Sequence, residues 1–403
     1  MELLSPAGGP EQLRLATHFG ADAVYCAGRR WGMRARSENF DDDELARAVA
    51  WAHGRATSVH VTLNVIMRDD DIEALPPYLE FLDHIGVDAV IVADLGALAL
   101  ARHHAPHVAV HLSTQASVMS AATADTWAGL GVRRVVLARE MTLADIAKLR
   151  RRCTKELELE AFAHGSLCMA YSGRCLLSAD LMGATRSANF GACAQPCRWG
   201  WHLVEEKTGA ELPIETDERG SYLLSSNDLC MIEHLDELAE AGVDAIKIEG
   251  RAKGSYYTAC VTNAYRHVLD GAPLEPWRAE LDYVSHRPYS TGFYFGDPTQ
   301  NPGRVGYARE RRMVGVVQSC QAEFGTFVVE LICRNRAVRD EDVLVLSPGE
   351  DVRKVTLAGL EEWDDESSTW NALDLMSKTM QRYRFRSPLP LSRGDVVCDE
   401  GRS

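Results

Sequence analysis

Residues 157–175 read L-E-L-E-A-F-A-H-G-S-L-C-M-A-Y-S-G-R-C and join a strand-like segment to a cysteine-rich loop. The first part, Leu157–Ala163, is predicted to be the seventh of eight short strands, most of which are followed by a helical pattern. Strands that alternate with helices at this spacing indicate parallel β–α units. Eight such units favour an α/β fold of the TIM type, a (β/α)8 barrel, over a doubly wound sheet. No G-x-G-x-x-G follows a strand, so a dinucleotide-binding fold is not supported.

The other units are assigned from the same signals of apolar runs, helical spacing and closing glycines. The predicted strands besides the seventh are Glu2–Ser5, Asp22–Cys26, Ser58–Leu63, Ala89–Ala93, Val108–Leu112, Val135–Ala138 and Ala245–Ile248. The predicted helices are Gln12–Phe19, Asp41–His53, Ile72–Ile85, Leu95–His103, Ala121–Leu130, Leu143–Arg152, Met231–Ala241 and Tyr256–Leu269. Between the seventh and eighth strands, Trp199–Leu224 is predicted to form a hairpin excursion.

Four cysteines follow the seventh strand with the spacing C-x6-C-x17-C-x3-C: Cys168, Cys175, Cys193 and Cys197. Thiolates are soft ligands, and four of them suit a zinc ion or an iron–sulfur cluster. Zinc sites usually use two short C-x2-4-C pairs, so the wide first gap favours a cluster. The alternative is four buried thiols that pack as small apolar groups. Cys230 lies close to the eighth strand and is a second candidate for the fourth ligand.

Composition limits the class of protein. The 403 residues suggest two or three domains, and 46% hydrophobic residues suffice for a large core. No run of 18 apolar residues predicts a membrane span, and the N-terminus lacks the layout of a signal peptide, so we expect a cytoplasmic protein. The net charge of −15 disfavours nucleic-acid binding unless basic residues are locally concentrated. Such concentrations occur at Arg29, Arg30, Arg34 and Arg36, at Arg309, Arg311 and Arg312, and at Arg382, Arg384 and Arg386, which alternate with Tyr383 and Phe385.

In a TIM-type barrel the chemistry lies at the carboxyl ends of the strands, where this sequence places polar residues. The catalytic candidates are Glu140, His164, Glu249 and Arg251, and the substrate-binding candidates are Arg139, Gln115, Asn64 and Tyr25. Arg139 and Arg251 could each hold a carboxylate in a bidentate fork. The alternative is that these arginines pair with Glu140 and Glu249 in a structural polar layer.

The pattern changes after the barrel. We expect the barrel over residues 1–285 with its cluster loop at 160–200, a Pro- and Gly-rich linker at 286–307, and a small antiparallel β-barrel domain at 308–403. Short strands with turn signals dominate this last part, and helical periodicity is predicted only for Ser367–Met380.

The stretch E-x-F-x-x-G-S-L-C-x6-C-x-x-S resembles the signature of the collagenase-like peptidase family. It matches at Glu160, Phe162, Gly165, Ser166, Cys168, Gly173, Cys175 and Ser178. The segments L-S-P-A-G at 4–8, S-T-Q at 113–115 and K-I-E-G-R at 247–251 are also similar to that family. The resemblance covers at least residues 2–270.

The resemblance implies an oxygen-independent hydroxylase with a 4Fe–4S cluster on the four cysteines, because several members have this activity despite the family name. Length and the C-terminal β module are similar to the tRNA-hydroxylating branch. That branch implies tRNA as partner, 5-hydroxyuridine at the wobble position as product, and prephenate, a small carboxylate, as co-substrate. A homologous partner subunit is compatible with this branch.

Four other functions stay open. One is a peptidase, although neither H-E-x-x-H nor G-x-S-x-G occurs. The second is a hydroxylase of ribosomal RNA, and the third is a hydroxylase of a ubiquinone precursor, for which the C-terminal domain would be superfluous. The fourth is a tRNA-binding scaffold in which the cysteines hold structural zinc.

Overall fold

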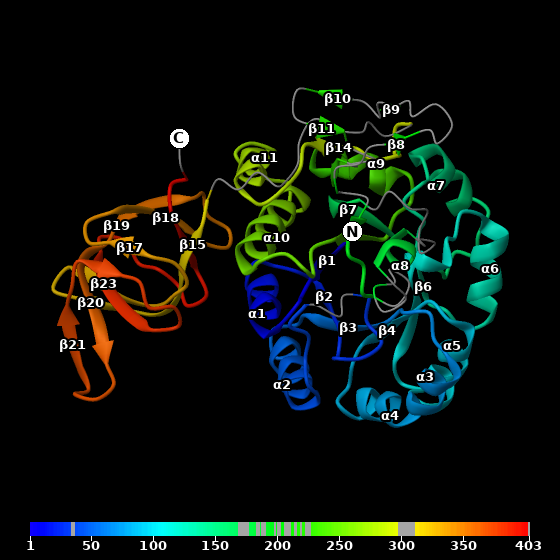
Figure 1. Ribbon diagram of the computed structural model, residues 1–403, viewed down its shortest axis with the longest axis horizontal. Helices are drawn as coiled ribbons and strands as arrows, with labels where there is room; N and C mark the ends of the chain where they lie inside the picture. The colour runs from blue at the N-terminus through cyan, green and yellow to red at the C-terminus, as the bar shows by residue number, and fades with distance from the viewer. Residues whose placement is uncertain are drawn as a thin grey trace. The chain divides into compact units, whose positions relative to one another are not determined.

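The computed structural model describes most of the chain in two compact units (Figure 1). The described residues are 1–33, 37–167, 177–182, 186, 191–196, 199, 227–296 and 311–401, with the short strands β8 (Leu203–Val204), β9 (Glu211–Leu212), β10 (Thr216–Asp217) and β11 (Gly220–Ser221). Within this part of the chain, no helix has the length and apolar character needed to cross a membrane.

The first unit contains a closed barrel of eight parallel strands, as the sequence predicts. The strand order is β13-β1-β2-β3-β4-β5-β6-β7, and β13 pairs with β7 to close the barrel. The strands are β1 (Glu2–Pro6), β2 (Ala23–Cys26), β3 (Ser58–Leu63), β4 (Ala89–Val92), β5 (Ala109–Leu112), β6 (Arg134–Val136), β7 (Glu158–Ser166) and β13 (Ala245–Ile248). Nearly every residue of these strands is buried, which fits strands covered on both faces.

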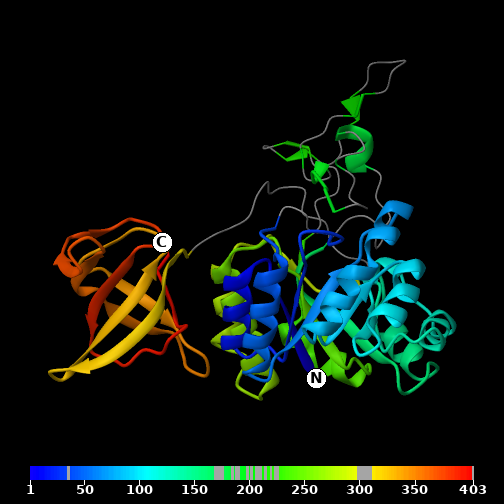
Figure 2. The ribbon, with the colours of Figure 1, turned by 90° about the horizontal axis from the view of Figure 1, so that it is seen from below.

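Helices flank the strands on the outside of the barrel (Figure 2). Those of the first unit are α2 (Asp42–His53), α3 (Asp69–Ala74), α4 (Pro76–His84), α5 (Leu95–His104), α6 (Ala121–Gly129), α7 (Leu143–Arg150) and α9 (Leu235–Glu240), preceded by the 3-10 turn η5 (Ile232–His234). Asp41 caps α2 with a capping box, and Asp94, one of the polar strand ends, caps α5 through its carboxylate.

One predicted helix is wrong in its continuity. Ile72–Ile85 was expected as a single helix, but the structure has α3 and α4 with a break at Leu75. Pro76 has no amide hydrogen to donate to the preceding turn, so it begins a new helix instead of continuing the old one, although Leu75 keeps helical backbone angles. The end of α3 and the first turns of α4 line the pocket described below, through Ala74, Pro77, Tyr78 and Phe81.

Two strands outside the barrel follow the cysteine-rich region. β12 (Asp228–Cys230) pairs antiparallel with the end of β7, and β14 (Tyr289–Ser290) pairs parallel with β12. Arg287 ties the two together because its guanidinium donates to the buried Asp228 carboxylate at 2.7 and 3.0 Å. The predicted excursion Trp199–Leu224 is described only at its four short strands, which pair as β8–β9 and β10–β11.

The second unit combines Arg14–Gly20, Gly254–Ser285 and Ala308–Ser403, of which residues 308–310, 402 and 403 lie outside the description. Its helical part is the end of α1 (Pro10–His18), α10 (Ser255–Leu269), α11 (Trp277–Glu280) and the 3-10 turn η6 (Leu281–Tyr283). Two buried contacts join this part to the β strands: Arg311 donates to Glu280 at 2.6 Å, and His18 lies 3.3 Å from Asp395.

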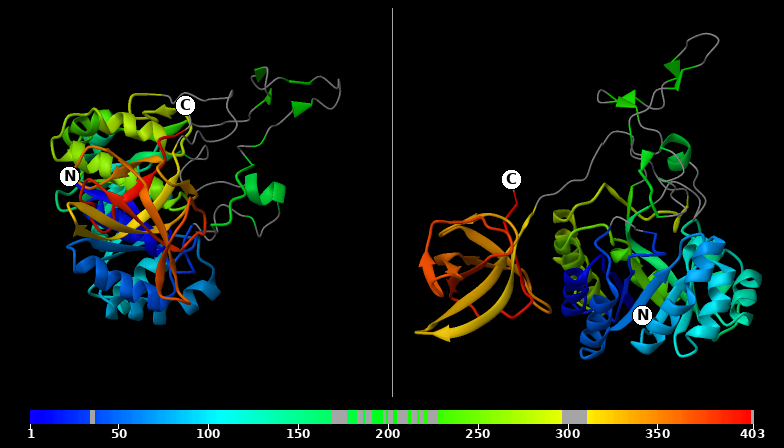
Figure 3. Two further views of the ribbon diagram at one scale, coloured as in Figure 1. Left: turned by 90° about the vertical axis from the view of Figure 1, so that its left-hand side faces the viewer. Right: turned by 60° about the horizontal axis from the view of Figure 1, so that its bottom comes forward.

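An eight-stranded antiparallel sheet, curved in Figure 3 (yellow to red), forms the rest of this unit, in the order β19-β18-β24-β15-β16-β23-β20-β21. Its strands are β15 (Met313–Glu323), β16 (Thr326–Cys333), β18 (Asp342–Leu346), β19 (Arg353–Thr356), β20 (Ala358–Asp364), β21 (Thr369–Ala372), β23 (Arg382–Ser387) and β24 (Val396–Cys398), with β17 (Ala337–Val338) and β22 (Leu375–Met376) paired separately. The helix expected within Ser367–Met380 is wrong, because β21 and β22 occupy this stretch.

Candidate active site

The predicted site residues lie at or next to the carboxyl ends of the barrel strands. One hydrogen-bonded chain links three of these ends. The amide of Met33, in the loop after β2, donates to Asn64 Oδ1 at 3.3 Å. Asn64 Nδ2 donates to Ser113 Oγ at 3.3 Å, and Ser113 Oγ donates to Gln115 Oε1 at 3.2 Å. The substrate-binding candidates Asn64 and Gln115 are therefore brought together, with Ser113 as the joining residue.

A second group joins the ends of β6, β7 and β13. A guanidinium nitrogen of Arg139 lies 3.8 Å from a Glu249 oxygen, and the group stands 4.0 Å from the centre of the Phe162 ring. The Glu249 amide donates to the carbonyl of His164 at 2.8 Å. Because the Arg139–Glu249 pair is loose and both side chains are partly exposed, the guanidinium retains donors for a ligand. Glu140 follows Arg139 and is half-buried in the same turn.

Arg251 is more deeply placed than a surface ligand-binding arginine. It is 3% exposed and donates to Thr62 Oγ1 at 2.6 Å and to Asn39 Oδ1 at 3.4 Å. A Cβ atom on Gly8 would lie only 2.1 Å from the carbonyl oxygen of Arg251. Position 8 therefore requires glycine. Arg251 therefore joins the loops after β1 and β2 to the end of β3, and its action on a carboxylate stays a prediction.

His164 and Tyr25 are buried within the barrel. His164 is fully buried in β7, opposite Cys230 of β12, and its ring lies 5.3 Å from that of Tyr289. The Tyr25 hydroxyl donates to the carbonyl of Ile248 at 2.9 Å, and Lys247 Nζ stands 4.3 Å above its ring. These contacts give Tyr25 a structural role in closing β2 against β13, in addition to the predicted substrate contact.

The sequence did not predict a buried ion network inside the barrel. Glu160 is completely buried and accepts from Lys247 Nζ at 2.8 Å and from Arg134 at 3.3 Å. Arg134 also holds Glu2 through two bonds, at 2.6 and 2.8 Å. Burial opposes ionisation of Glu160, but Lys247 and Arg134 hold its pKa below the ordinary value. The sequence feature that could have predicted this network is a charged residue inside an otherwise apolar strand, as in A-I-K-I at 245–248.

Two histidines lie inside the barrel near this network. The rings of His60 and His111 meet edge to face at 4.8 Å, and in the described part of the chain neither Nδ1 atom has a hydrogen-bond partner. Burial lowers the pKa of His60 to about 4, against the opposing effect of Glu160. Burial also lowers the pKa of His111 well below its ordinary value. Both rings are therefore neutral in the folded protein near pH 7.

Acidification should destabilise the protein through His60. In the unfolded chain His60 takes up a proton near pH 6.5, whereas in the folded chain it does so only near pH 4. The unfolded state therefore binds more protons between these values, and stability falls as pH decreases through this window, by about 3 kcal/mol. The slope of the unfolding free energy against pH reports how many more protons the unfolded chain binds than the folded one. In urea unfolding across this pH window, we expect His60→Gln to reduce that number by about one. Replacing the exposed His103 with Gln should leave it unchanged. Equal slopes in all three proteins would contradict the assignment.

The cysteine loop is described around Cys193, and Cys168, Cys175 and Cys197 lie outside the described residues. Ser178, three residues after Cys175, accepts from the amide of Ala194 at 2.8 Å and donates to the carbonyl of Arg186. This hydroxyl therefore joins the start of α8 (Leu177–Met182) to the segment that carries Cys193. Cys193 is exposed, and its sulfur accepts from the amide of Gln195 at 3.3 Å.

Gly191 places this loop on the barrel. Its φ is +80°, and a Cβ there would lie 2.8 Å from the carbonyl oxygen of Gly32 and 3.1 Å from Met33. A Cβ on Gly32 would in turn lie 3.2 Å from a guanidinium nitrogen of Arg251. The loop that carries Cys193 therefore packs on the Gly32–Met33 turn after β2, and this turn contacts Asn64.

The expected basic surfaces differ from the prediction. Tyr383 and Phe385 are buried in the core of the β sheet, so these two rings are not available to stack on RNA. The alternating arginines point outward, and each pairs with a glutamate, in the pairs Arg382–Glu330, Arg384–Glu361 and Arg386–Glu323. Arg311 is buried against Glu280, and Arg312 pairs with Asp399. Arg34, Arg36 and Arg309 lie outside the described residues.

The closed parallel barrel with polar residues at its strand ends defines a TIM-type barrel protein, a class in which enzymes carry their sites at that face. Residues 8–303 match the model of Peptidase family U32, and the chain belongs to this family. It is 33% identical over 396 residues to "tRNA hydroxylation protein P1" of Bacillus subtilis, covering 96% of this chain and 91% of that protein.

Two further relatives carry protease names. An "Uncharacterized protease" of Methanocaldococcus jannaschii is 43% identical over 311 residues, which cover 75% of this chain and 74% of that protein. A "Collagenase" of Porphyromonas gingivalis is 32% identical over 313 residues, which cover 73% of both chains. The match to the B. subtilis protein thus spans nearly the whole chain, whereas these two matches cover about three quarters of it.

Proposed function

We propose that this chain is a cytoplasmic tRNA hydroxylase that forms 5-hydroxyuridine at the wobble position without dioxygen, with a 4Fe–4S cluster and prephenate as co-substrate. The observation that carries the proposal is the end-to-end match to a protein named for tRNA hydroxylation, which includes the C-terminal β domain. The carboxyl-end site under the cysteine loop supports it, because this is where barrel proteins bind and convert ligands.

The described part of the loop suits a cluster. Thiolate sulfur is the usual ligand of iron–sulfur clusters, and the Cys193 side chain is exposed rather than packed in the core. The Ser178 hydroxyl accepts from the amide of Ala194, next to Cys193, and Ser178 follows Cys175 by three residues in the sequence. We propose Cys168, Cys175, Cys193 and Cys197 as the ligands, with Cys230 as the alternative fourth. When bound, the cluster supplies the transfer of electrons.

The reaction exchanges a carbon–hydrogen bond of uracil for a carbon–oxygen bond. This oxidation needs an oxygen donor other than dioxygen and an electron acceptor. Arg139 is suited to bind a carboxylate of prephenate, because its pairing with Glu249 is loose and its charge is permanent. Glu140 follows β6 and Glu249 follows β13, and the two glutamates are the candidates for moving protons. Arg251 donates to Thr62 in β3, next to the Gly32–Met33 turn whose Met33 amide donates to Asn64, and we propose that it positions this end of the site.

The remaining candidates act by position. Gln115 and Asn64 present amide groups at neighbouring strand ends, and amides can pair with the donor and acceptor edge of uracil. Tyr25 and His164 lie below them inside the barrel. A uridine in an unstacked anticodon loop can swing into such a site at little cost, which suits a base-modifying enzyme.

The test is direct hydroxylation by the full-length, anaerobically purified chain. We expect tRNA that lacks the modification to gain 5-hydroxyuridine, detected by mass spectrometry of its nucleosides, when prephenate is present and the cluster is loaded. Omitting prephenate or removing iron should each abolish the product. A chain that stays inactive on tRNA but hydroxylates ribosomal RNA or a ubiquinone precursor would overturn the substrate assignment. Iron-independent cleavage of gelatin would instead support a peptidase.

A further inference from the structure

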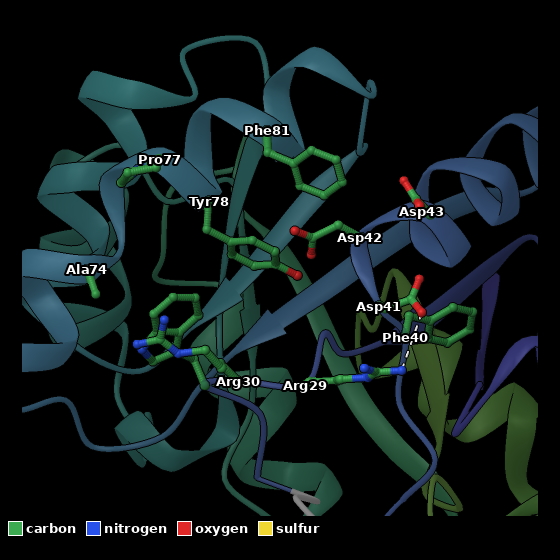
Figure 4. Close-up of a pocket in the computed structure, with 11 residues that line it drawn as sticks. Arg29, Arg30, Phe40, Asp41, Asp42, Asp43, Ala74, Pro77, Tyr78 and Phe81 are labelled. Carbon is green, nitrogen blue, oxygen red and sulfur yellow. Dashed lines mark hydrogen bonds and ion pairs between the residues drawn. The ribbon is translucent and has the colours of Figure 1, made fainter.

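A pocket of about 580 Å³ lies beside the carboxyl end of β2, between the start of α2 and helix α4 (Figure 4). One side is the loop after β2 with Arg29, Arg30 and Trp31, and the other side is α4 with Tyr78 and Phe81. None of the candidate active-site residues described above lines this pocket. It is continuous in sequence with the Gly32–Met33 turn on which the cysteine loop packs.

Aromatic rings build the wall of the pocket, and their positions are fixed. The rings of Trp31 and Tyr78 lie 5.3 Å apart, and those of Tyr78 and Phe81 are stacked at 5.9 Å. Trp31 Nε1 donates to Asp71 at 3.2 Å, which holds the indole in place. A Cβ on Gly28 would lie 2.3 Å from the Tyr78 hydroxyl oxygen, so glycine is required for the tyrosine to pack here. The wall is therefore formed before any ligand arrives.

The polar groups of the pocket carry both signs of charge. Arg30 stacks over Trp31 at 4.1 Å, and Arg29 is well exposed and pairs weakly with Asp41 at 3.3 Å. Asp42 and Asp43 are exposed at the start of α2 on the facing side. The buried hydroxyl of Tyr78 has no hydrogen-bond partner in the described part of the chain. A buried polar group without a partner is uncommon in proteins and calls for an explanation such as a ligand or water.

We propose that this pocket binds an unpaired RNA base that carries an exocyclic amino group, which is adenine, cytosine or guanine, beside the target uridine. The inference rests on the proposed tRNA substrate and names how the chain holds the neighbouring nucleotide. The rings and the Arg30 plane stack on a base, and the carboxylates of Asp42 and Asp43 accept from its amino group. Arg29 and Arg30 can reach the flanking phosphates.

The charge of the pocket argues for this class of base. Three aspartates face two arginines at the pocket, in a chain of net charge −15, so a phosphate group alone would be repelled. A base is neutral, and its amino group is a donor suited to carboxylates. Uracil has no exocyclic amino group and offers a carboxylate only its single N3–H donor. The pocket therefore suits a neighbour of the uridine rather than the uridine itself.

The experiment measures binding without any hydroxylation step. Fluorescently labelled single-stranded RNAs, one adenine-rich and one uracil-rich, are titrated with the full-length, cluster-loaded chain. We expect Phe81→Leu and Arg30→Gln each to weaken binding of the adenine-rich RNA by about 10-fold, with little effect on the uracil-rich RNA. The matched controls are Trp51→Leu and Arg55→Gln, because Arg55 stacks over Trp51 at 3.9 Å away from this pocket. Both controls should bind like the unchanged chain.

The outcomes separate this inference from the proposed function. Unchanged affinity in both pocket variants, in a chain that binds RNA, overturns the base pocket and leaves the hydroxylase proposal standing. Failure of the unchanged chain to bind either RNA overturns both. Pocket variants that weaken binding of a gelatin peptide but not of RNA would assign the pocket to a peptide and overturn the base assignment. Because Arg30 is exposed, its variant remains informative even where Phe81→Leu perturbs the fold.

Discussion

Replacing Lys247 with methionine should destabilise the barrel by about 3–5 kcal/mol, because it leaves the Glu160 carboxylate buried beside a single remaining cation. Lys247 is 4% exposed and Glu160 is fully buried, so neither group can turn to water when its partner is lost. Arg134 cannot fully replace the lost ammonium, because it also holds Glu2 and Glu158. The measurement is the urea midpoint of the cluster-loaded chain, followed by circular dichroism.

The control for this prediction is Arg133→Met. Arg133 pairs with Glu158 at 3.3 Å, but its side chain is 68% exposed, so the loss should be below about 1 kcal/mol. The double variant Lys247→Met with Glu160→Gln removes both charges and should be less destabilised than the sum of its single changes. Equal losses of unfolding free energy in Lys247→Met and Arg133→Met would show that the buried pair stabilises the protein no more than the exposed pair.

The sequence allowed most of the barrel to be predicted because each strand is a short apolar run bounded by turn residues. β3 and β13 were predicted with the bounds they have in the structure, and the other strands of the barrel differ by a few residues. The break between α3 and α4 was missed, although Pro76 and Pro77 lie in the predicted helix. The helical periodicity on both sides of the prolines favoured one continuous helix. Proline, however, cannot donate the backbone hydrogen bond that would continue a helix, so the prediction was wrong at this point.

The candidate site was predicted less well, for a physical reason. Strand-end position is readable from sequence, so Asn64, Gln115, Arg139 and Glu249 could be named, and the structure joins them in two groups. Burial is not readable in the same way. Arg251 reads as an exposed strand end but is 3% exposed among neutral oxygens. The pocket on α4 was not found, because its aromatic wall combines residues almost 50 positions apart.

The β domain shows the same limit. Alternation of arginine with tyrosine and phenylalanine in β23 was interpreted as an RNA surface, but alternation alone does not say which face is buried. The structure buries the aromatic face and pairs the arginine face with glutamates from β15, β16 and β20. Exposed ion pairs of this kind contribute little to stability. Contact with tRNA by this domain is therefore still a prediction, and it does not depend on these two rings.

The last prediction concerns the cysteines, because their loss should abolish both the cluster and hydroxylation. Cys193→Ala should reduce iron from about four atoms per chain to less than one, with loss of the visible absorption of the cluster and of tRNA hydroxylation. Cys193 is an exposed thiol in the turn that Ser178 ties to the segment after Cys175. The control is Cys320→Ala, a half-buried thiol on β15 of the second unit, which should keep its iron and activity.

The fourth ligand is decided by comparing two variants. We expect Cys197→Ala to lose iron and Cys230→Ala to keep it, because Cys197 lies in the same loop as the other three. The structure makes Cys230 the serious alternative: it is half-buried on β12, which pairs with the end of β7 from which the loop starts. Burial raises the pKa of Cys26 and of Cys398 to about 12, so these thiols are poor ligands. Iron loss in Cys230→Ala together with retention in Cys197→Ala would move the fourth ligand to β12, and iron retention in Cys193→Ala would remove the loop as the cluster site.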